Sequence, residues 1–153
     1  MSNWADWVSI ETAKSKRGPF NHLGIYQIRA VTPAGESIPI HRLVGIDSSG
    51  ILYIGRSGYN SNRSIANRIG EFVRQQHSGR QKHSGGVTYA RAKPILERAP
   101  QFSGHHLQVR AKLLSTKEDI DLAEAKALDE YFSEHAELPP CNSARNKRGG
   151  RLT

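Results

Sequence analysis

The sequence is poor in cysteine and has no long apolar run, and each shortage excludes a class of protein. Its 153 residues include a single cysteine, Cys141. An internal disulfide and a zinc site with several cysteine ligands are therefore excluded. No apolar run approaches the roughly 20 residues that a membrane-spanning helix needs, and residues 1–18 lack the apolar core of a secretory signal. We expect a cytoplasmic protein that does not associate with membranes.

Acidic residues are also scarce relative to basic ones. The chain has 14 Asp and Glu against 22 Lys and Arg, which gives a net charge of +8 and a pI near 9.9. Two stretches are basic and contain no acid: residues 72–96, with Arg74, Arg80, Lys82, Arg91 and Lys93, and the tail after Asn142, with Arg145, Lys147, Arg148 and Arg151. Such blocks suit a nucleic acid, because each neutralised phosphate releases counterions. A solvated surface with an unstructured tail is the alternative interpretation.

Periodicity predicts the order of the secondary structure. Strands are expected at 23–31, at 51–54 and, with clean alternation, at 106–113. Helices are expected at 64–77 and 116–135, and one or two helical turns beginning at Pro94. This order predicts an α+β domain in which helices pack on a small sheet. Trp4 and Trp7 lie in a segment that forms either a short amphipathic turn on the domain or an arm for a partner or a second subunit.

The stretch from Ile51 to His77 combines a strand, a glycine-containing loop and a helix. In the helix, Ile65, Ile69, Phe72 and Val73 fall on one face, and Ser64 is the expected N-cap. Arg68 lies at the edge of that buried face, where a charge needs a partner. A strand, a glycine loop and an inward arginine are typical of phosphate-binding sites, although they do not specify a reaction.

Glu124 breaks the apolar stripe of the second helix. On a helical wheel it falls among Ile120, Ala127 and Leu128, whereas Asp121 and other acids fall outside. A carboxylate in an apolar face costs several kcal/mol unless it is paired, bound to metal or shifted in pKa. It is therefore a buried Glu–Arg pair, a catalytic acid or a metal ligand; in a chain of net charge +8, a single Mg²⁺ that holds a phosphate fits this position.

Several of these residues together resemble one family. Gly24-Ile25-Tyr26 and Tyr53-Ile54-Gly55 resemble the two signatures of the GIY-YIG nucleases. Arg68, Glu124 and Asn142 then follow in the order of that family, so the resemblance covers roughly residues 23–142. The long spacer between the signatures is similar to that of the restriction-enzyme branch.

The resemblance implies a three-stranded antiparallel sheet flanked by helices, and cleavage of phosphodiester bonds with one Mg²⁺ or Mn²⁺ ion. By similarity, Tyr26 is the general base or positions the attacking water, and Tyr53 hydrogen-bonds that water or the phosphate. Arg68 stabilises charge on the phosphate, Glu124 binds the metal and Asn142 ties the site together. Arg56 follows the second signature and lies near the phosphate. Arg56 and Arg68 are expected to lower the pKa of the tyrosines.

One departure concerns a histidine that many members carry one turn after the helix arginine. Phe72 stands there, so either the role is absent or His77 or His83 fills it; both are expected in a mobile loop, facing phosphate. Arg74, Arg80 and Lys82 complete the expected nucleic-acid contacts. The chain then divides into an N-terminal extension (1–21), a nuclease-like domain (22–142) and a basic tail (143–153).

The function that we expect is a divalent-metal-dependent DNA endonuclease, acting in restriction, defence or DNA processing as a monomer or homodimer. The alternatives are a nucleic-acid-binding module that has lost activity, and an enzyme of the same fold that cleaves RNA.

Overall fold

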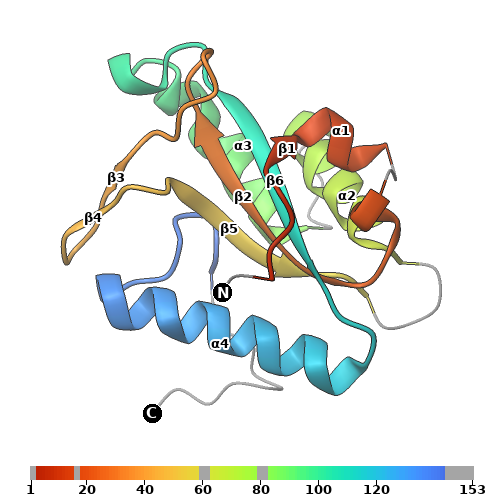
Figure 1. The fold of residues 1–153 in the computed structure, drawn as a ribbon. Coiled ribbons are helices and arrows are strands. Elements are labelled where there is room, and N and C mark those ends of the chain that lie inside the picture. Colours follow the sequence, from red (N-terminus) through yellow and green to blue (C-terminus); the bar gives the residue numbers. More distant parts are fainter. Residues whose placement is uncertain (1–2, 16–17, 59–62, 79–82, 144–153) are drawn as a thin grey trace.

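The computed structural model describes residues 3–15, 18–58, 63–78 and 83–143, with only the backbone of 75–78. The described residues form a four-stranded antiparallel sheet with the order β1-β6-β2-β5 (Figure 1). These strands are β1 (Val8–Ser9), β6 (His106–Leu113), β2 (Gly24–Val31) and β5 (Ile51–Arg56). A separate hairpin pairs β3 (Ile40–His41) with β4 (Ile46–Asp47). The α+β class is confirmed.

The expected number of strands in the main sheet is wrong. Three were predicted, and the N-terminal segment adds a fourth, because Val8 pairs with Val109 and Ser9 with Gln108 at the free edge of β6. A two-residue strand is too short to show alternation in the sequence. Its pairing depends on contacts with the finished sheet, which no local pattern encodes.

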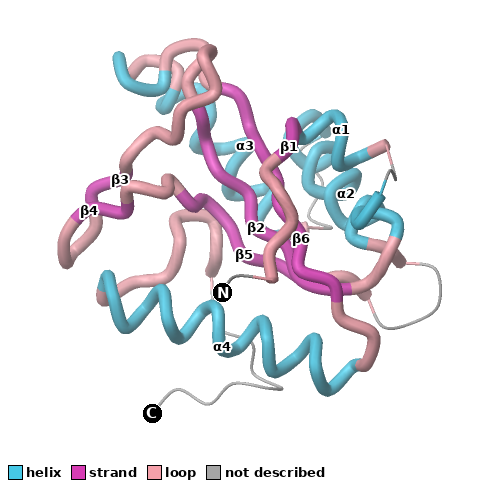
Figure 2. The backbone as a smooth tube through the Cα atoms, in the orientation of Figure 1, coloured by secondary structure: helices cyan, strands magenta, loops and turns pink. Residues whose placement is uncertain are grey.

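Helices cover both faces of the sheet (Figures 1 and 2). They are α1 (Ile10–Lys14), α2 (Ile65–Ser78), α3 (Ser84–Leu96) and α4 (Lys117–His135), with short 3-10 turns η1 (Gly18–Asn21) and η2 (Pro100–Phe102). Helices α1, α2 and α3 lie on one face, whereas α4 lies on the other, next to β5. None of the helices in the described part of the chain is long and apolar enough to cross a membrane.

Helix α3 is the element that the sequence did not reveal. Its 13 residues include Gly85 and Gly86 in the first turn, and Pro94 lies inside it rather than at the start of a helix. Glycine disfavours helix, so the segment has the composition of a loop. Packing overrides that preference, because α3 lies against α2 and buries Gly85, Gly86 and Tyr89.

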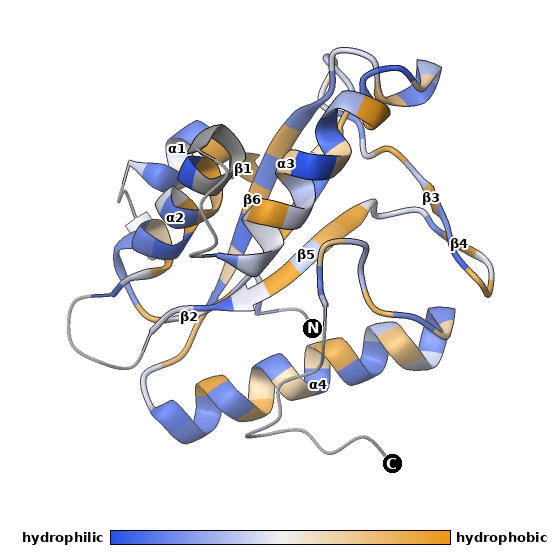
Figure 3. Cartoon of the chain, turned by 180° about the vertical axis from the view of Figure 1, so that it is seen from behind, coloured by the Kyte–Doolittle hydropathy of each residue, from blue (hydrophilic) through white to orange (hydrophobic). Residues whose placement is uncertain are grey.

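Two apolar clusters hold these layers together. The larger one joins Tyr26, Ile28 and Val109 of the sheet to Ile69 and Phe72 of α2. The smaller one joins β5 to α4 through Ile51, Ile54, Leu128 and Tyr131. Figure 3 shows the apolar residues of β5, in orange, between α3 and α4. The strand β5 is therefore apolar on both faces and lies at an edge of the sheet, where helices from both sides meet.

Gly24 is required where β2 passes close to β6. Its φ is +154°, and a Cβ added there would lie 2.0 Å from the carbonyl oxygen of Lys112. Gly24→Ala should therefore lower the free energy of unfolding by about 3 kcal/mol or more, because backbone cannot yield as a side chain can. Chemical denaturation measures the loss. Gly35→Ala is the control: its φ is +87° but no atom lies within 4 Å of the new Cβ, so a loss of about 1–2 kcal/mol is expected. Equal losses would contradict the steric account.

Candidate active site

A polar pocket of about 200 Å³ lies beside β5, where α2, α3 and α4 converge. It is lined by Tyr53, Arg56, Arg68, Ser84, Glu124, Leu128, Asn142 and Ser143. Four of the five residues expected to be catalytic therefore line one pocket, although they come from segments far apart in the chain. The fifth, Tyr26, is fully buried next to Tyr53.

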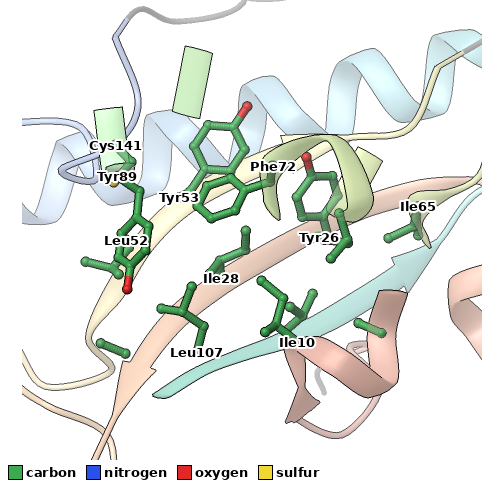
Figure 4. Packing of buried hydrophobic residues seen from close by; sticks show 14 of the residues in the cluster. Ile10, Tyr26, Ile28, Leu52, Tyr53, Ile65, Phe72, Tyr89, Leu107 and Cys141 are labelled. Atoms are coloured by element: carbon green, nitrogen blue, oxygen red, sulfur yellow. The ribbon is translucent and has the colours of Figure 1, made fainter. Parts of the chain in front are cut away.

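The two signature tyrosines lie side by side because of the sheet register. Tyr26 pairs with Gly55, and Tyr53 pairs with Ile28, so both rings project to one face. Their ring centroids are 6.0 Å apart, and their hydroxyl groups point the same way (Figure 4). A Cβ on Gly55 would lie 2.5 Å from the Tyr53 ring and 2.6 Å from the Tyr26 ring, and one on Gly85 would lie 2.5 Å from Tyr53. The two glycines therefore leave the space that the tyrosines occupy.

Burial governs the ionisation of both phenols. It raises the pKa of Tyr26 well above its usual value, and Tyr53 raises it further, while Arg68 acts in the opposite direction. Burial likewise raises the pKa of Tyr53 to about 12, although Arg68 partly lowers it. Arg68 therefore acts in the predicted direction, but desolvation is larger, and a net lowering of these pKa values was the wrong expectation. Both phenols carry their protons at neutral pH.

Arg68 is held by an acid that the sequence analysis did not single out. Its Nη1 lies 2.6 Å from Oε1 of Glu71, three residues further along α2, and Glu71 also pairs with Arg63. Burial alone would lower the pKa of Arg68, but Tyr26, Glu71 and Tyr53 together raise it. The guanidinium is therefore charged and fixed at the pocket wall. The i, i+3 spacing was the available signal for this pair.

Glu124 is buried, as the helical wheel predicted, with 9% of its surface exposed. Nε of Arg56 lies 3.7 Å from its Oε1, so the buried Glu–Arg pair is present. Arg56 also pairs through Nη1 with Asp121, one helical turn earlier on α4. Asp121 was expected to be a plain surface acid, and it faces the same arginine because the turn of the helix brings it to the same side.

Glu124 supplies the carboxylate among the residues that line this pocket. In the described part of the chain, no group of three or more His, Cys, Asp or Glu residues is placed to hold a metal. A metal here would depend on the Glu124 carboxylate, completed by water and phosphate oxygens, and Mg²⁺ is commonly bound by one or two carboxylates in this way. Arg56 places a positive charge beside this carboxylate.

Asn142 ties the chain to the edge of β5. Its Oδ1 accepts a hydrogen bond from the backbone N–H of Ile54 at 3.0 Å, and its Nδ2 donates to the Ile54 carbonyl at 2.9 Å. The preceding residue, Cys141, donates its backbone N–H to Leu52. The amide of Asn142 thus pairs with the strand edge as another strand would. Both polar atoms of its side chain therefore hold the backbone of Ile54, next to Tyr53.

His83 lies inside the site and not on a surface loop, which corrects the prediction. It is 1% exposed and caps the start of α3, where its Nδ1 accepts a hydrogen bond from the N–H of Gly86 at 3.2 Å. Its Nε2 lies 3.1 Å from the hydroxyl oxygen of Tyr26. Burial and Arg68 lower its pKa to about 4, so the ring is neutral. Because Nδ1 is the acceptor, Nε2 carries the proton and donates it to Tyr26.

The remaining predicted contacts lie elsewhere. Arg74 is exposed on α2 and lines a separate groove with Lys14 and Arg63, so it does not face the tyrosine pocket. Arg80, Lys82 and the side chain of His77 lie outside the described residues. Comparisons with protein-family models, with curated proteins and with solved structures gave no significant match to the chain. Function is therefore inferred from the residues of the site.

Proposed function

We propose that this protein is a divalent-metal-dependent endonuclease of the GIY-YIG type that hydrolyses DNA phosphodiester bonds. The observation that carries the proposal is the pocket beside β5. There Tyr53, Arg68, Glu124 and Asn142 converge, and Tyr26 is packed directly beside Tyr53. A fixed cation, a buried carboxylate and a phenol in one pocket, with a second phenol packed behind them, form a set that stabilises phosphate and orients water.

Each residue has a role that its surroundings support. Arg68 presents a charged guanidinium for the non-bridging phosphate oxygens, which carry the growing negative charge. Glu124 would hold Mg²⁺, which when bound supplies positive charge close to the scissile phosphate. Tyr53 faces the pocket and hydrogen-bonds the attacking water. Because burial raises the pKa of Tyr26 and the residue is fully buried, we favour a positioning role for Tyr26 over that of a general base.

The charge of the chain supports a nucleic-acid substrate. The net charge of +8 favours the binding of polyanions. The test is to incubate the purified protein with supercoiled plasmid and, in parallel, with total RNA, in Mg²⁺ and in EDTA. Cleavage of plasmid in Mg²⁺ alone is the expected result. Cleavage restricted to RNA would reassign the substrate, and binding without cleavage of either would contradict the enzymatic proposal in favour of a nucleic-acid-binding module.

His83 offers a sharp test of how Tyr26 is held. The two ring nitrogens have separate partners, and two variants keep one bond each. Asparagine places its Oδ1 near the position of Nδ1, so His83→Asn keeps the cap on α3 but removes the donor to Tyr26. Glutamine reaches the position of Nε2, so His83→Gln keeps that donor and removes the cap.

We expect His83→Asn to slow DNA cleavage about 10- to 100-fold with near-normal stability, because one hydrogen bond that positions a tyrosine of the site contributes roughly this much. His83→Gln should lose about 1 kcal/mol of stability through the missing cap and keep most of the cleavage rate. Nicking rates and thermal melting measure the two effects. A His83→Asn variant that cleaves at the normal rate would show that this histidine acts only as a helix cap.

A further inference from the structure

The face of the sheet opposite the tyrosines carries a second cluster of cations. Arg29 on β2 and Arg110 on β6 project to this face, and the N-terminal segment lies over them, anchored by the hydrogen bond from Ala5 N–H to the Ala111 carbonyl. Arg110 stacks on both tryptophans, with its Cζ 4.7 Å from the ring centroid of Trp4 and 4.8 Å from that of Trp7. Arg29 lies 4.2 Å from Trp7.

These two guanidiniums lack an acidic partner within the described residues. Nε of Arg110 donates to Oε1 of Gln27 at 2.8 Å, and Arg29 donates to Oε1 of Gln108 at 2.7 and 3.0 Å. Both acceptors are neutral amides. Half-buried charges are normally paired with an opposite charge, and here the neighbouring arginine adds repulsion. The positive charge of these two arginines is therefore not balanced by a carboxylate among the described residues.

The two terminal nitrogens of the Arg110 guanidinium are available to bind a ligand. Its Nε is held by Gln27 and its guanidinium contacts two indole rings, whereas no described residue accepts a hydrogen bond from its two terminal nitrogens. Arg110 lines a cleft of about 360 Å³ between the sheet and α4. Lys112, two residues along the same strand and on the same face, lines the cleft as well. A rigid guanidinium with two free N–H groups suits the oxygens of a phosphate.

The carboxylates of the cleft come from the opposite wall, on β4 and α4. Asp47 accepts hydrogen bonds from Ser49, Ile51 and Tyr131, so it is already satisfied. Glu130 pairs with Lys126 at 3.9 Å, and Glu134 lies 4.0 Å from His135. None of the three pairs with Arg110. They restrict an anion to the end of the cleft that is formed by Arg110 and Lys112.

We propose that Arg110 and Lys112 form a phosphate-binding site for a nucleic-acid strand, separate from the tyrosine pocket. The cleft is larger than a single phosphate ion, and its Arg110–Lys112 end places an aromatic ring, that of Trp4, beside cationic side chains, which is the combination that binds single strands. This site does not depend on the proposed cleavage activity. A protein that binds nucleic acid here could be catalytically silent, so the two proposals fail separately.

The chain contains a reporter for this site alone, because both of its tryptophans, Trp4 and Trp7, stack on Arg110. The experiment titrates the full chain with an oligothymidylate in EDTA and follows tryptophan fluorescence. We expect a saturable change in emission. Arg110→Gln should weaken binding about tenfold or more, and Lys112→Gln severalfold, whereas Arg98→Gln, a charge-matched change at an exposed position, should bind within about twofold of the unmodified chain.

Three results would overturn the proposal. The first is a tryptophan signal that DNA does not alter. The second is normal affinity in both Arg110→Gln and Lys112→Gln. The lysine variant remains informative if the arginine variant melts early, because the tryptophans stack on Arg110 and that stacking is kept when Lys112 is replaced. The third concerns inorganic phosphate. If it produces the same signal at the same phosphate concentration, the site binds free phosphate and not a strand.

Discussion

Replacing Glu124 with glutamine is expected to slow Mg²⁺-dependent DNA cleavage by about 10³-fold or more, while DNA affinity in EDTA stays within about twofold of normal. Glutamine has the same shape, so the packing of α4 on β5 should persist, but its amide carries no charge and is a much weaker ligand for Mg²⁺. The buried position of Glu124, 9% exposed and beside Arg56, makes the loss specific to this carboxylate. Initial rates of plasmid nicking and an anisotropy titration measure the two quantities.

Glu118→Gln is the matched control for that variant. Glu118 lies in the first turn of the same helix and is exposed, so the substitution changes the net charge equally without touching the pocket. It should cleave at the normal rate. If Glu124→Gln also cleaved at that rate, the assignment of the metal ligand would be wrong.

Tyr26→Phe should reduce cleavage about 100-fold or more and leave the fold intact. Phenylalanine fills the same space in the core, and only the hydroxyl oxygen that accepts the hydrogen bond from His83 is lost. The unpaired Nε2–H of His83 then costs about 1–3 kcal/mol of stability. The larger effect on rate is expected because, in the proposed mechanism, the phenol positions Tyr53 and the attacking water. Plasmid nicking rates and denaturant unfolding separate the two effects.

The core holds a second tyrosine–histidine pair that serves as the control. Tyr89 is buried with its hydroxyl 2.5 Å from Nε2 of His105, and this pair does not line the tyrosine pocket. Tyr89→Phe removes a comparable hydrogen bond and should lower stability by a similar amount without slowing cleavage. If both substitutions slowed cleavage equally, the loss in Tyr26→Phe would reflect a weakened core and not a role in the site.

Much of the fold was predictable from local patterns. The alternation in the sequence predicted the limits of β6. Thr116, at the expected start of α4, caps that helix, and its hydroxyl accepts a hydrogen bond from the N–H of Asp119 at 3.1 Å. These elements carry their own periodicity or capping signal. Helix α3 and strand β1 do not. The glycines of α3 lower its helix propensity, so its sequence does not predict a helix. Strand β1 forms by pairing with the edge of β6. Both elements therefore depend on tertiary contacts.

The residues of the site also divide into those that a local pattern predicts and those whose place depends on the folded chain. Glu124 was found because a charge within an apolar stripe is visible on a helical wheel, and the structure buries it. His83 was misplaced because its position depends on α3, whose first turn carries it to Tyr26. The pKa of the tyrosines was misjudged for a related reason. A list of nearby cations can be drawn from the sequence, but the degree of burial, which outweighs them, requires the packed core.

The metal dependence of plasmid nicking tests the central claim most directly. Purified protein in EDTA is mixed with supercoiled plasmid, and Mg²⁺ is then added in increasing amounts while the nicked and linear forms are quantified. The proposed metal site at Glu124 predicts no cleavage in EDTA and a rate that rises with Mg²⁺ and then saturates. Cleavage undiminished by EDTA, or none at any concentration of Mg²⁺ or Mn²⁺, would contradict it.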